Sequence, residues 1–342
     1  MLRVIPSILT RALGTSGLQI TTVGFGSWAT GGGGWAFGWG PQDDDLSIAA
    51  IHRAVELGVN WIDTAAIYGL GHSEEVVGRA VRALPAAARP LVFTKCGLEW
   101  DDADPMRAAE RVLTPRTVRR GIEDSLRRLG LESVDLFQIH WPDDQGNPVE
   151  EAWTEMVKLR EEGKARAIGV SNFDPGLLAR IEPIGHVDAL QPPFSLIDRE
   201  TAAELLPWAR AHGTGVICYS PMASGILTDS FSAARVAAMA DDDWRRRPPS
   251  FNEPELGRNL SLRDALRPIA ARRGATVAAV AVAWVTRWPG VSGAIVGARS
   301  PEQVDGWIES ASLELTDEDL EEIAVAMQAT GAGEGPADPR RA

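Results

Sequence analysis

Four polar residues of this sequence, Asp63, Tyr68, Lys95 and His140, each stand where a short apolar run stops or just beyond it. Short runs of this kind, separated by helical stretches, predict parallel strands that are buried on both faces. In a barrel of such strands, the catalytic groups lie at the carboxyl ends of the strands. An acid, a phenol, an ammonium group and an imidazole at three successive strand ends therefore predict an active site.

These four side chains suit the reduction of a carbonyl group by hydride transfer. Negative charge develops on the carbonyl oxygen, so a proton donor is needed beside it, and Tyr68 can be that general acid. A free phenol has a pKa of about 10, so we expect the ammonium group of Lys95 to lower it. Asp63 would hold Lys95 in place, and His140 would orient and polarise the carbonyl. Taken singly, each residue is also typical of a buried ion pair or of a core position.

Predicted strands and helices alternate along the chain, which indicates an α/β protein. Eight strand candidates are each followed by a helix, so we expect a (β/α)8 TIM barrel. An N-terminal β-hairpin over 11–21 and two extra helices, over 258–273 and 316–328, fall outside this repeat. The strand candidates are 23–27, 59–63, 91–95, 134–139, 166–170, 187–191, 215–219 and 293–297. The helix candidates are 44–57, 73–84, 114–129, 149–162, 175–183, 199–212, 276–287 and 301–310.

The domain organisation is predicted to be simple. Residues 1–330 would form one barrel domain, and residues 331–342, rich in glycine, proline and charge, would form a flexible tail. Segments 29–43 and 221–257 lack periodicity and are expected to be long loops on the substrate-binding side of the barrel. Three helix starts carry a capping residue followed by proline, namely Thr114-Pro115, Asp174-Pro175 and Ser300-Pro301.

The composition of the chain argues against several classes of binding partner and of cellular environment. The chain has 342 residues and a net charge of −13, which repels phosphate backbones and argues against nucleic acid. Its two cysteines, Cys96 and Cys218, lie in apolar runs, so they predict a reducing, cytoplasmic environment and no metal site. Residues 1–10 are too short and too interrupted for a signal peptide, and no run of 18 apolar residues predicts a membrane span.

Longer strings surround these four residues and continue along the chain. They are Asp63-Thr64-Ala65-Ala66-Ile67-Tyr68-Gly69, Thr94-Lys95, Gln138-Ile139-His140-Trp141, Ile168-Gly169-Val170-Ser171-Asn172-Phe173, Tyr219-Ser220-Pro221 and Gly297-Ala298-Arg299. Together these strings resemble the aldo-keto reductase family. The resemblance covers about residues 10–328, and its details look most like the bacterial general-stress branch of the family.

This resemblance implies a nicotinamide cofactor that lies extended across the barrel mouth. By motif, Ser171, Asn172 and Gln191 would hold the carboxamide, and Tyr219 would stack on the nicotinamide ring. Arg299 can pair with a 2′-phosphate, which favours NADPH and leaves NADH as the alternative. The other implied contacts are Gly26, Ser27 and Trp28 beneath the nicotinamide, Ser220, Pro221, Gly225 and Leu227 along the pyrophosphate, and Gly297 and Gln303 near the adenosine end.

Two departures from the family pattern concern the cofactor. Asp229-Ser230 stand where many relatives have a basic residue, and Gly306-Trp307 stand where many have Glu-Asn. Arg245, Arg246 or Arg247 are candidates for the missing positive charge. The string Gly24-Phe25-Gly26-Ser27-Trp28-Ala29 fits a dinucleotide-binding motif, but four glycines follow where that motif needs a helix.

Tryptophans dominate the expected substrate pocket, namely Trp35, Trp39, Trp100 and Trp141. An aromatic wall predicts apolar or aromatic carbonyl substrates. No cluster of basic residues in the sequence indicates a phosphorylated or strongly acidic substrate. Two other functions stay open: a redox-sensing or regulatory protein that binds NADPH and turns over slowly, and an isomerase or aldolase with Lys95 as a Schiff base. The oligomeric state is also open.

Overall fold

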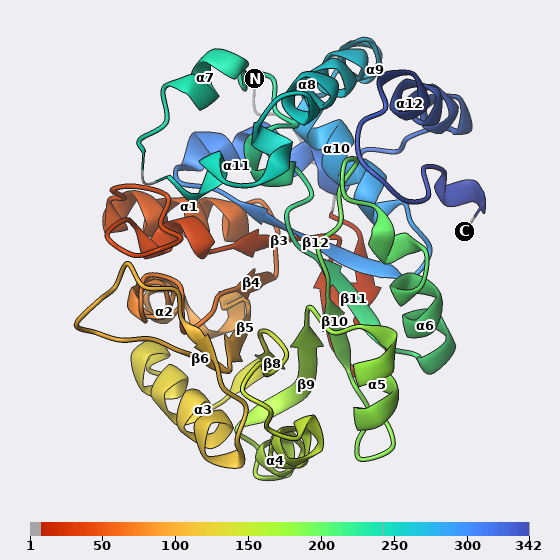
Figure 1. The fold of residues 1–342 in the computed structure, drawn as a ribbon. Coiled ribbons are helices and arrows are strands. Elements are labelled where there is room, and N and C mark those ends of the chain that lie inside the picture. The colour runs from red at the N-terminus through yellow and green to blue at the C-terminus, as the bar shows by residue number, and fades with distance from the viewer. Residues whose placement is uncertain (1–7, 242, 342) are drawn as a thin grey trace.

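Eight parallel strands close into a barrel in the computed structural model, which describes residues 8–241 and 243–341 (Figure 1). Each strand pairs with the next in chain order, and β12 pairs with β3 to complete the ring. The expected (β/α)8 TIM barrel is confirmed. The expectation of no signal peptide concerns residues 1–10, most of which lie outside the described residues. The barrel strands are β3 (Val23–Gly26), β4 (Trp61–Asp63), β5 (Leu91–Cys96), β8 (Val134–Ile139), β9 (Ala165–Ser171), β10 (Ala189–Gln191), β11 (Gly215–Cys218) and β12 (Val291–Gly297).

Helices follow the barrel strands and surround them (Figure 1). Two of the predicted starts have capping hydrogen bonds: Thr114 accepts from the N–H of Thr117 at 3.1 Å, and Asp174 accepts from that of Leu177 at 2.8 Å. The surrounding helices are α1 (Asp44–Glu56), α2 (His72–Ala83), α3 (Pro115–Leu129), α4 (Val149–Glu161), α5 (Pro175–Ile181), α6 (Leu205–His212), α10 (Val277–Thr286) and α11 (Pro301–Trp307).

The extra helices differ in part from the prediction. The single helix expected over 258–273 is two helices, α8 (Glu255–Ala265) and α9 (Arg267–Arg273), because Pro268 lacks the N–H that a continuous helix needs there. The other is α12 (Asp317–Thr330), and a short α7 (Ala233–Ala237) lies in the segment predicted to be irregular. Within the described ranges, no single helix has the length and hydropathy of a membrane span.

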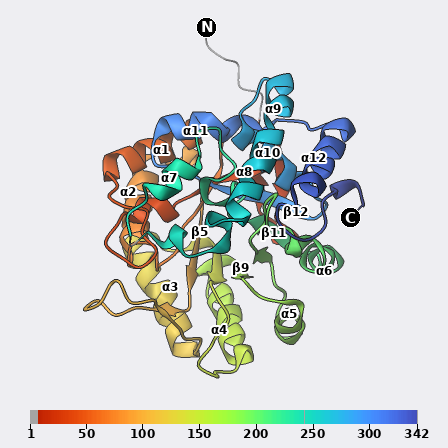
Figure 2. The ribbon, with the colours of Figure 1, turned by 45° about the horizontal axis from the view of Figure 1, so that its top comes forward.

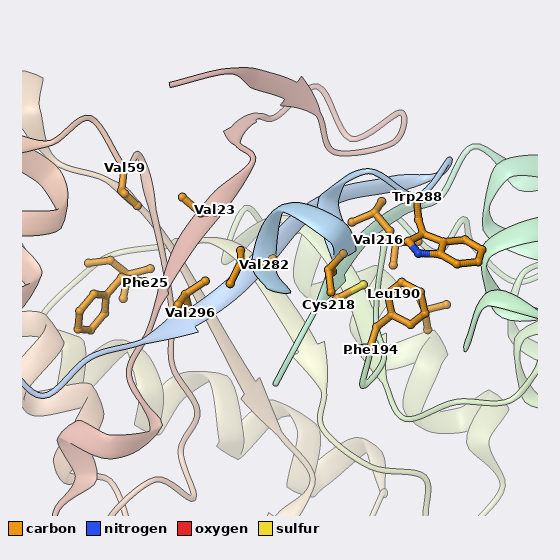
Figure 3. Close-up of a cluster of buried hydrophobic side chains, with 14 of the residues drawn as sticks. Val23, Phe25, Val59, Leu190, Phe194, Val216, Cys218, Val282, Trp288 and Val296 are labelled. Atoms are coloured by element: carbon orange, nitrogen blue, oxygen red, sulfur yellow. The ribbon is translucent and has the colours of Figure 1, made fainter. Parts of the chain in front are cut away.

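Apolar side chains fill the space between the barrel and the helices (Figure 3). Val23 and Phe25 on β3 are fully buried beside Val296 of β12, and Val282 of α10 packs in the same cluster. Burying one such side chain stabilises the fold by about 1.5–3 kcal/mol. This layer fixes the strand ends that carry the polar residues.

The N-terminal hairpin, β1 (Thr10–Ala12) with β2 (Gln19–Thr21), closes the amino end of the barrel. Trp61 fills the interior above it, and its indole N–H donates to the backbone oxygen of Thr21 at 2.8 Å. A Cβ on Gly24 would lie 2.2 Å from the Trp61 ring, so this glycine is required by packing. A 3-10 turn over Trp28–Gly31 follows, so the dinucleotide-binding motif has no helix of its own.

The C-terminal segment 331–341 is packed, which differs from the flexible tail that its composition predicts. It lies beside α12 in both ribbon views (Figures 1 and 2). Ala332 and Pro339 are buried, and Arg340 forms an ion pair with Asp338 at 2.7 Å. Backbone oxygens of the segment accept hydrogen bonds from Arg199, a partner more than 130 residues away that composition does not reveal.

Candidate active site

The four residues predicted to do chemistry meet at the carboxyl end of the barrel. Asp63 ends β4, Lys95 lies on β5, His140 follows β8, and Tyr68 lies in the turn after β4. The Lys95 Nζ donates to Asp63 Oδ1 at 2.5 Å and to the backbone oxygen of Thr64 at 2.9 Å, and it lies 3.5 Å from Tyr68 Oη. The Tyr68 and His140 rings have centroids 5.7 Å apart and planes at 80°. Barrel closure therefore places an acid, its neighbouring cation and an imidazole around one point.

Burial sets the protonation of these groups. Burial raises the pKa of Tyr68 well above its usual value, and the negative charge of Asp63 adds to this. Burial also lowers the pKa of His140 well below its usual range, and the charge of Lys95 acts in the same direction. In the net shift of the Tyr68 pKa, burial and then Asp63 outweigh the lowering expected from Lys95, whose Nζ lies 3.5 Å from Tyr68 Oη. Both rings are neutral at pH 7, so Tyr68 carries a proton to donate.

Two buried glutamines contact the carboxylate of Asp63. Gln191, at the end of β10, donates from Nε2 to Asp63 Oδ2 at 2.9 Å, and Nε2 of Gln138 on β8 lies 3.5 Å from the same oxygen. The sequence assigned no role to Gln138. A signal existed, because Gln138 and His140 are two residues apart on a strand run and so face the same side.

Asn172 connects the imidazole side of the site to the aromatic ring predicted to face the cofactor. Its Nδ2 donates to the backbone oxygen of His140 at 2.9 Å, and its Oδ1 accepts from the Tyr219 hydroxyl at 2.8 Å. Asn172 has a φ of 61°, and the hydroxyl of Ser171 donates to the backbone oxygen of Gln191 at 2.7 Å. The residues expected to hold a carboxamide are thus rigidly oriented beside the tetrad.

A cavity of about 950 Å³ opens over these residues, with lining from the carboxyl ends of β3, β4, β9, β10 and β12 and from residues that follow β5, β8 and β11. Ligand pockets span about 300–1,000 Å³, so this one is large. Leu227 does not line it, because this side chain is buried in the hydrophobic core. Trp100 is also absent from the lining, and its indole N–H donates to Asp102 at 2.9 Å. The predicted residues that line the cavity are Gly26, Ser27, Trp28, Ser171, Asn172, Gln191, Tyr219, Ser220, Pro221, Gly225, Gly297, Arg299, Gln303, Trp35, Trp39 and Trp141.

The backbone after β11 adopts an unusual conformation along the predicted pyrophosphate path. Ser220, Ala223 and Ser224 have φ values of 56°, 48° and 52°, and Gly225 has a φ of 101°. Non-glycine residues rarely adopt positive φ, and those that do cluster at ligand sites. A run of such residues beside the cavity fits a backbone shaped for ligand contact.

Three arginines gather along the cavity. Burial lowers the pKa of Arg299, and the positive charges of Arg245 and Arg235 act in the same direction, so the Arg299 guanidinium lies near those of the other two. Among the described residues Arg299 forms no ion pair, and its Nε donates to Gln42 Oε1 at 2.7 Å. Arg245 pairs with Asp243 at 2.5 Å. Such a cluster fits an anionic ligand.

Of the arginines at 245–247, only Arg245 lines the cavity. Arg246 donates to the backbone oxygen of Met239 at 2.9 Å, and Arg247 donates to that of Ala36 at 3.2 Å. Sequence reasoning missed Arg235. It lies in α7, a helix that the sequence did not predict.

Trp244 of segment 221–257 contacts two tryptophans at the other side of the cavity, Trp28 and, in segment 29–43, Trp39. Trp244 stacks on Trp28 with ring centroids 5.0 Å apart, and its edge meets Trp39 at 5.6 Å. All three indoles line the cavity. Sequence reasoning missed Trp244, because the pairing links residues about 200 positions apart and leaves no local signal.

The four residues that depart from the family pattern, Asp229, Ser230, Gly306 and Trp307, all line the cavity. Asp229 accepts from the backbone N–H of Val277 at 3.1 Å, so this carboxylate is held in place at the wall. Trp307 is buried, and its indole N–H has no partner among the described residues. In the described part of the chain, no group of three or more His, Cys, Asp or Glu side chains is arranged to hold a metal ion.

Comparison with known proteins agrees with this geometry. Residues 22–327 match the model of the aldo/keto reductase family. The chain is 33% identical to the aldo-keto reductase YhdN of Bacillus subtilis over 320 residues, which is 93% of each chain. It is 32% identical to the NADH-specific methylglyoxal reductase of Escherichia coli over 330 residues, 92% of this chain and 98% of that one.

Solved structures share the fold. The glycerol dehydrogenase AKR11B4 from Gluconobacter oxydans superposes with a TM-score of 0.85 at 38% identity, covering 96% of this chain and 97% of that one. The aldo-keto reductase AKR11C1 from Bacillus halodurans superposes with a TM-score of 0.76 at 22% identity, covering 93% and 96%. The resemblance that the sequence motifs indicated is confirmed, and this chain belongs to the aldo/keto reductase family of oxidoreductases.

Proposed function

We propose that this protein reduces aldehydes and ketones to alcohols with NADPH, and that Tyr68 is the general acid. The observation that carries the proposal is that Tyr68 lines the cavity and its hydroxyl lies 3.5 Å from Lys95 Nζ. The nicotinamide cofactor would supply the hydride. The protein's own residues then bind the carbonyl, place its oxygen near Tyr68 Oη and deliver the proton.

Each neighbouring residue has a defined part in that step. The ammonium group of Lys95 stabilises the negative charge that remains on the Tyr68 oxygen once the proton has left. Asp63 and Thr64 fix the Lys95 Nζ through hydrogen bonds of 2.5 and 2.9 Å. The neutral imidazole of His140 donates a hydrogen bond to the carbonyl oxygen, which polarises the carbonyl carbon for hydride attack.

The preference for NADPH rests on positive charge along the cavity. Arg299, Arg245 and Arg235 lie near one another, and Arg299 has no described carboxylate partner. A 2′-phosphate adds charge that guanidinium groups bind well. A relative named as NADH-specific makes NADH the alternative cofactor.

The side chains that line the cavity support a class of substrate, and the two cysteines support a location in the cell. The tryptophans at the cavity support an apolar or aromatic small-molecule carbonyl compound as the partner. Two buried free thiols, Cys96 and Cys218, support a cytoplasmic location.

The test is oxidation of NADPH and of NADH with 4-nitrobenzaldehyde, comparing the intact protein with Tyr68→Phe. We expect turnover with a lower KM for NADPH, and a loss of about 10²–10⁴-fold in kcat for the variant, the contribution typical of general acid catalysis. NADPH binding, followed by fluorescence titration, should change little in the variant.

Other results would redirect the proposal. Equal rates for both proteins would remove Tyr68 as the acid. Tight NADPH binding without turnover by the intact protein would favour the redox-sensing function. A lower KM for NADH would reverse the cofactor preference.

A further inference from the structure

The cavity wall is far more basic than the protein as a whole. Five arginines and two aspartates line it, although the chain has a net charge of −13. Lys95 compensates Asp63 at 2.5 Å, and Arg267 lies 3.3 Å from Asp229. Three of the arginines belong to the cofactor wall described above. The other two, Arg107 and Arg111, lie at the substrate side, on the segment after β5.

A small hairpin places Arg111 beside the catalytic residues. Strands β6 (Leu98–Glu99) and β7 (Glu110–Arg111) pair antiparallel, with Leu98 opposite Arg111. Leu98 packs in the apolar cluster that includes Tyr68. The Arg111 guanidinium lies 4.4 Å from the ring centroid of Trp141, the residue after His140. Arg111 therefore pairs with Leu98, which packs near Tyr68, and contacts Trp141, which follows His140 in the sequence.

Arg111 is also electrostatically unsatisfied. Among the described residues it forms no ion pair, and its side chain donates no hydrogen bond; its contact is the Trp141 face. Arg107 differs, because it is exposed and pairs with Glu110 at 2.5 Å. A guanidinium group over the face of an aromatic ring keeps the N–H donors in its own plane free for a planar acceptor.

We propose that Arg111 binds a carboxylate on the substrate, so that the preferred substrates are aldehydes or ketones that carry a carboxylate group. This inference rests on the proposed carbonyl reduction. A carboxylate matches one guanidinium in charge and shape. A phosphate dianion fits less well, because Asp101, Asp102 and Asp104 stand exposed on the same segment. This proposal departs from the expectation that no cluster of basic residues indicates a strongly acidic substrate, because folding places the single residue Arg111 over Trp141.

The test compares two substrates that differ in one charge, 4-carboxybenzaldehyde and methyl 4-formylbenzoate. For the intact protein we expect kcat/KM to be higher for the carboxylate, mainly through a lower KM. In Arg111→Gln the ratio of the two kcat/KM values should fall by about 10–100-fold, the range for loss of a charged hydrogen-bonded partner. Arg111→Lys should recover part of the ratio, because it restores the charge without the planar fork.

Arg107→Gln is the matched control, since it removes one positive charge from the same segment. Its ratio should stay within about twofold of that of the intact protein, because an exposed ion pair contributes little. An intact protein that prefers the ester, or an unchanged ratio in Arg111→Gln, would overturn this inference alone. Failure to reduce either aldehyde with either cofactor would instead overturn the proposed function, and this inference with it.

Discussion

At the scale of single residues, Asp63 organises the catalytic group. Its Oδ1 accepts from Lys95 at 2.5 Å and its Oδ2 from Gln191 at 2.9 Å. A carboxylate held from both sides fixes the ammonium group under the Tyr68 hydroxyl. Each partner comes from a different strand, so the position of Lys95 depends on the barrel and not on local sequence.

The protonation of His140 gives a prediction at this scale. Burial and the charge of Lys95 hold the pKa of His140 well below its usual value. The imidazole therefore stays neutral as the pH falls through about 6.5, where a free histidine gains a proton. We expect kcat/KM of the intact protein to be flat between pH 6 and 8, measured with a saturating cofactor. His140→Gln should be slower with the same flat profile. An inflection near pH 6.5 that disappears in the variant would contradict a neutral imidazole.

At the scale of elements, one carboxylate fastens α12 to α9. Burial acts to raise the pKa of Asp319, but hydrogen bonds from Arg272, the backbone of Thr316 and Arg273 lower it to about 2. The distances are 2.7 Å to Arg272, 2.9 Å to the Thr316 nitrogen and 2.7 Å to Arg273. Asp319 thus caps α12 and joins it to its neighbour.

Asp319→Asn should lower the free energy of unfolding by about 1–2 kcal/mol at pH 7. This amount is smaller than the free energy that corresponds to the whole pKa shift, because Arg272 is partly exposed to solvent. The folded pKa is below the unfolded value of about 3.9. The stabilisation is therefore complete above pH 4 and decreases as the pH falls toward 2. Urea unfolding at pH 7 and pH 3 measures this. Glu322→Gln, which removes an exposed carboxylate from Arg272, is the control and should cost less than about 0.5 kcal/mol. Equal losses in both variants would argue against a special role for Asp319.

At the scale of the whole molecule, the C-terminal segment completes the packing around Arg199. This side chain is only 5% exposed. It donates to backbone oxygens of Leu196, Ala332, Gly333 and Gly335, the last three at 3.1, 3.1 and 3.2 Å. A buried guanidinium needs such acceptors, because an unsatisfied charged donor is costly.

Deletion of residues 331–342 should therefore destabilise the protein by about 2–4 kcal/mol, since Arg199 loses three of its acceptors. Deletion of 337–342 alone keeps those acceptors and removes the ion pairs of Arg340, so we expect a loss below about 1 kcal/mol. Urea unfolding of both truncated proteins measures the difference. Equal stabilities would show that Arg199 does not need the segment.

The sequence by itself determined the elements and the chemistry. Strands buried on both faces produce continuous apolar runs. The caps at Thr114 and Asp174 act within one helical turn. Both signals are local, so both can be recognised in the sequence. Because parallel strands bring their carboxyl ends to one side, Asp63, Lys95 and His140 were predicted to meet. The resemblance to a family rested on the same strings.

Tertiary structure alone decided the contacts between distant segments. The stacking of Trp244 on Trp28, the placement of Arg111 on Trp141 and the burial of Arg199 under the C-terminal segment all join parts of the chain that carry no mutual local signal. The protonation of Tyr68 belongs here too, because it depends mainly on burial, which only the folded barrel and its loops provide. Loop and terminal segments gain their partners only once the barrel has closed, since their own propensities favour no single conformation.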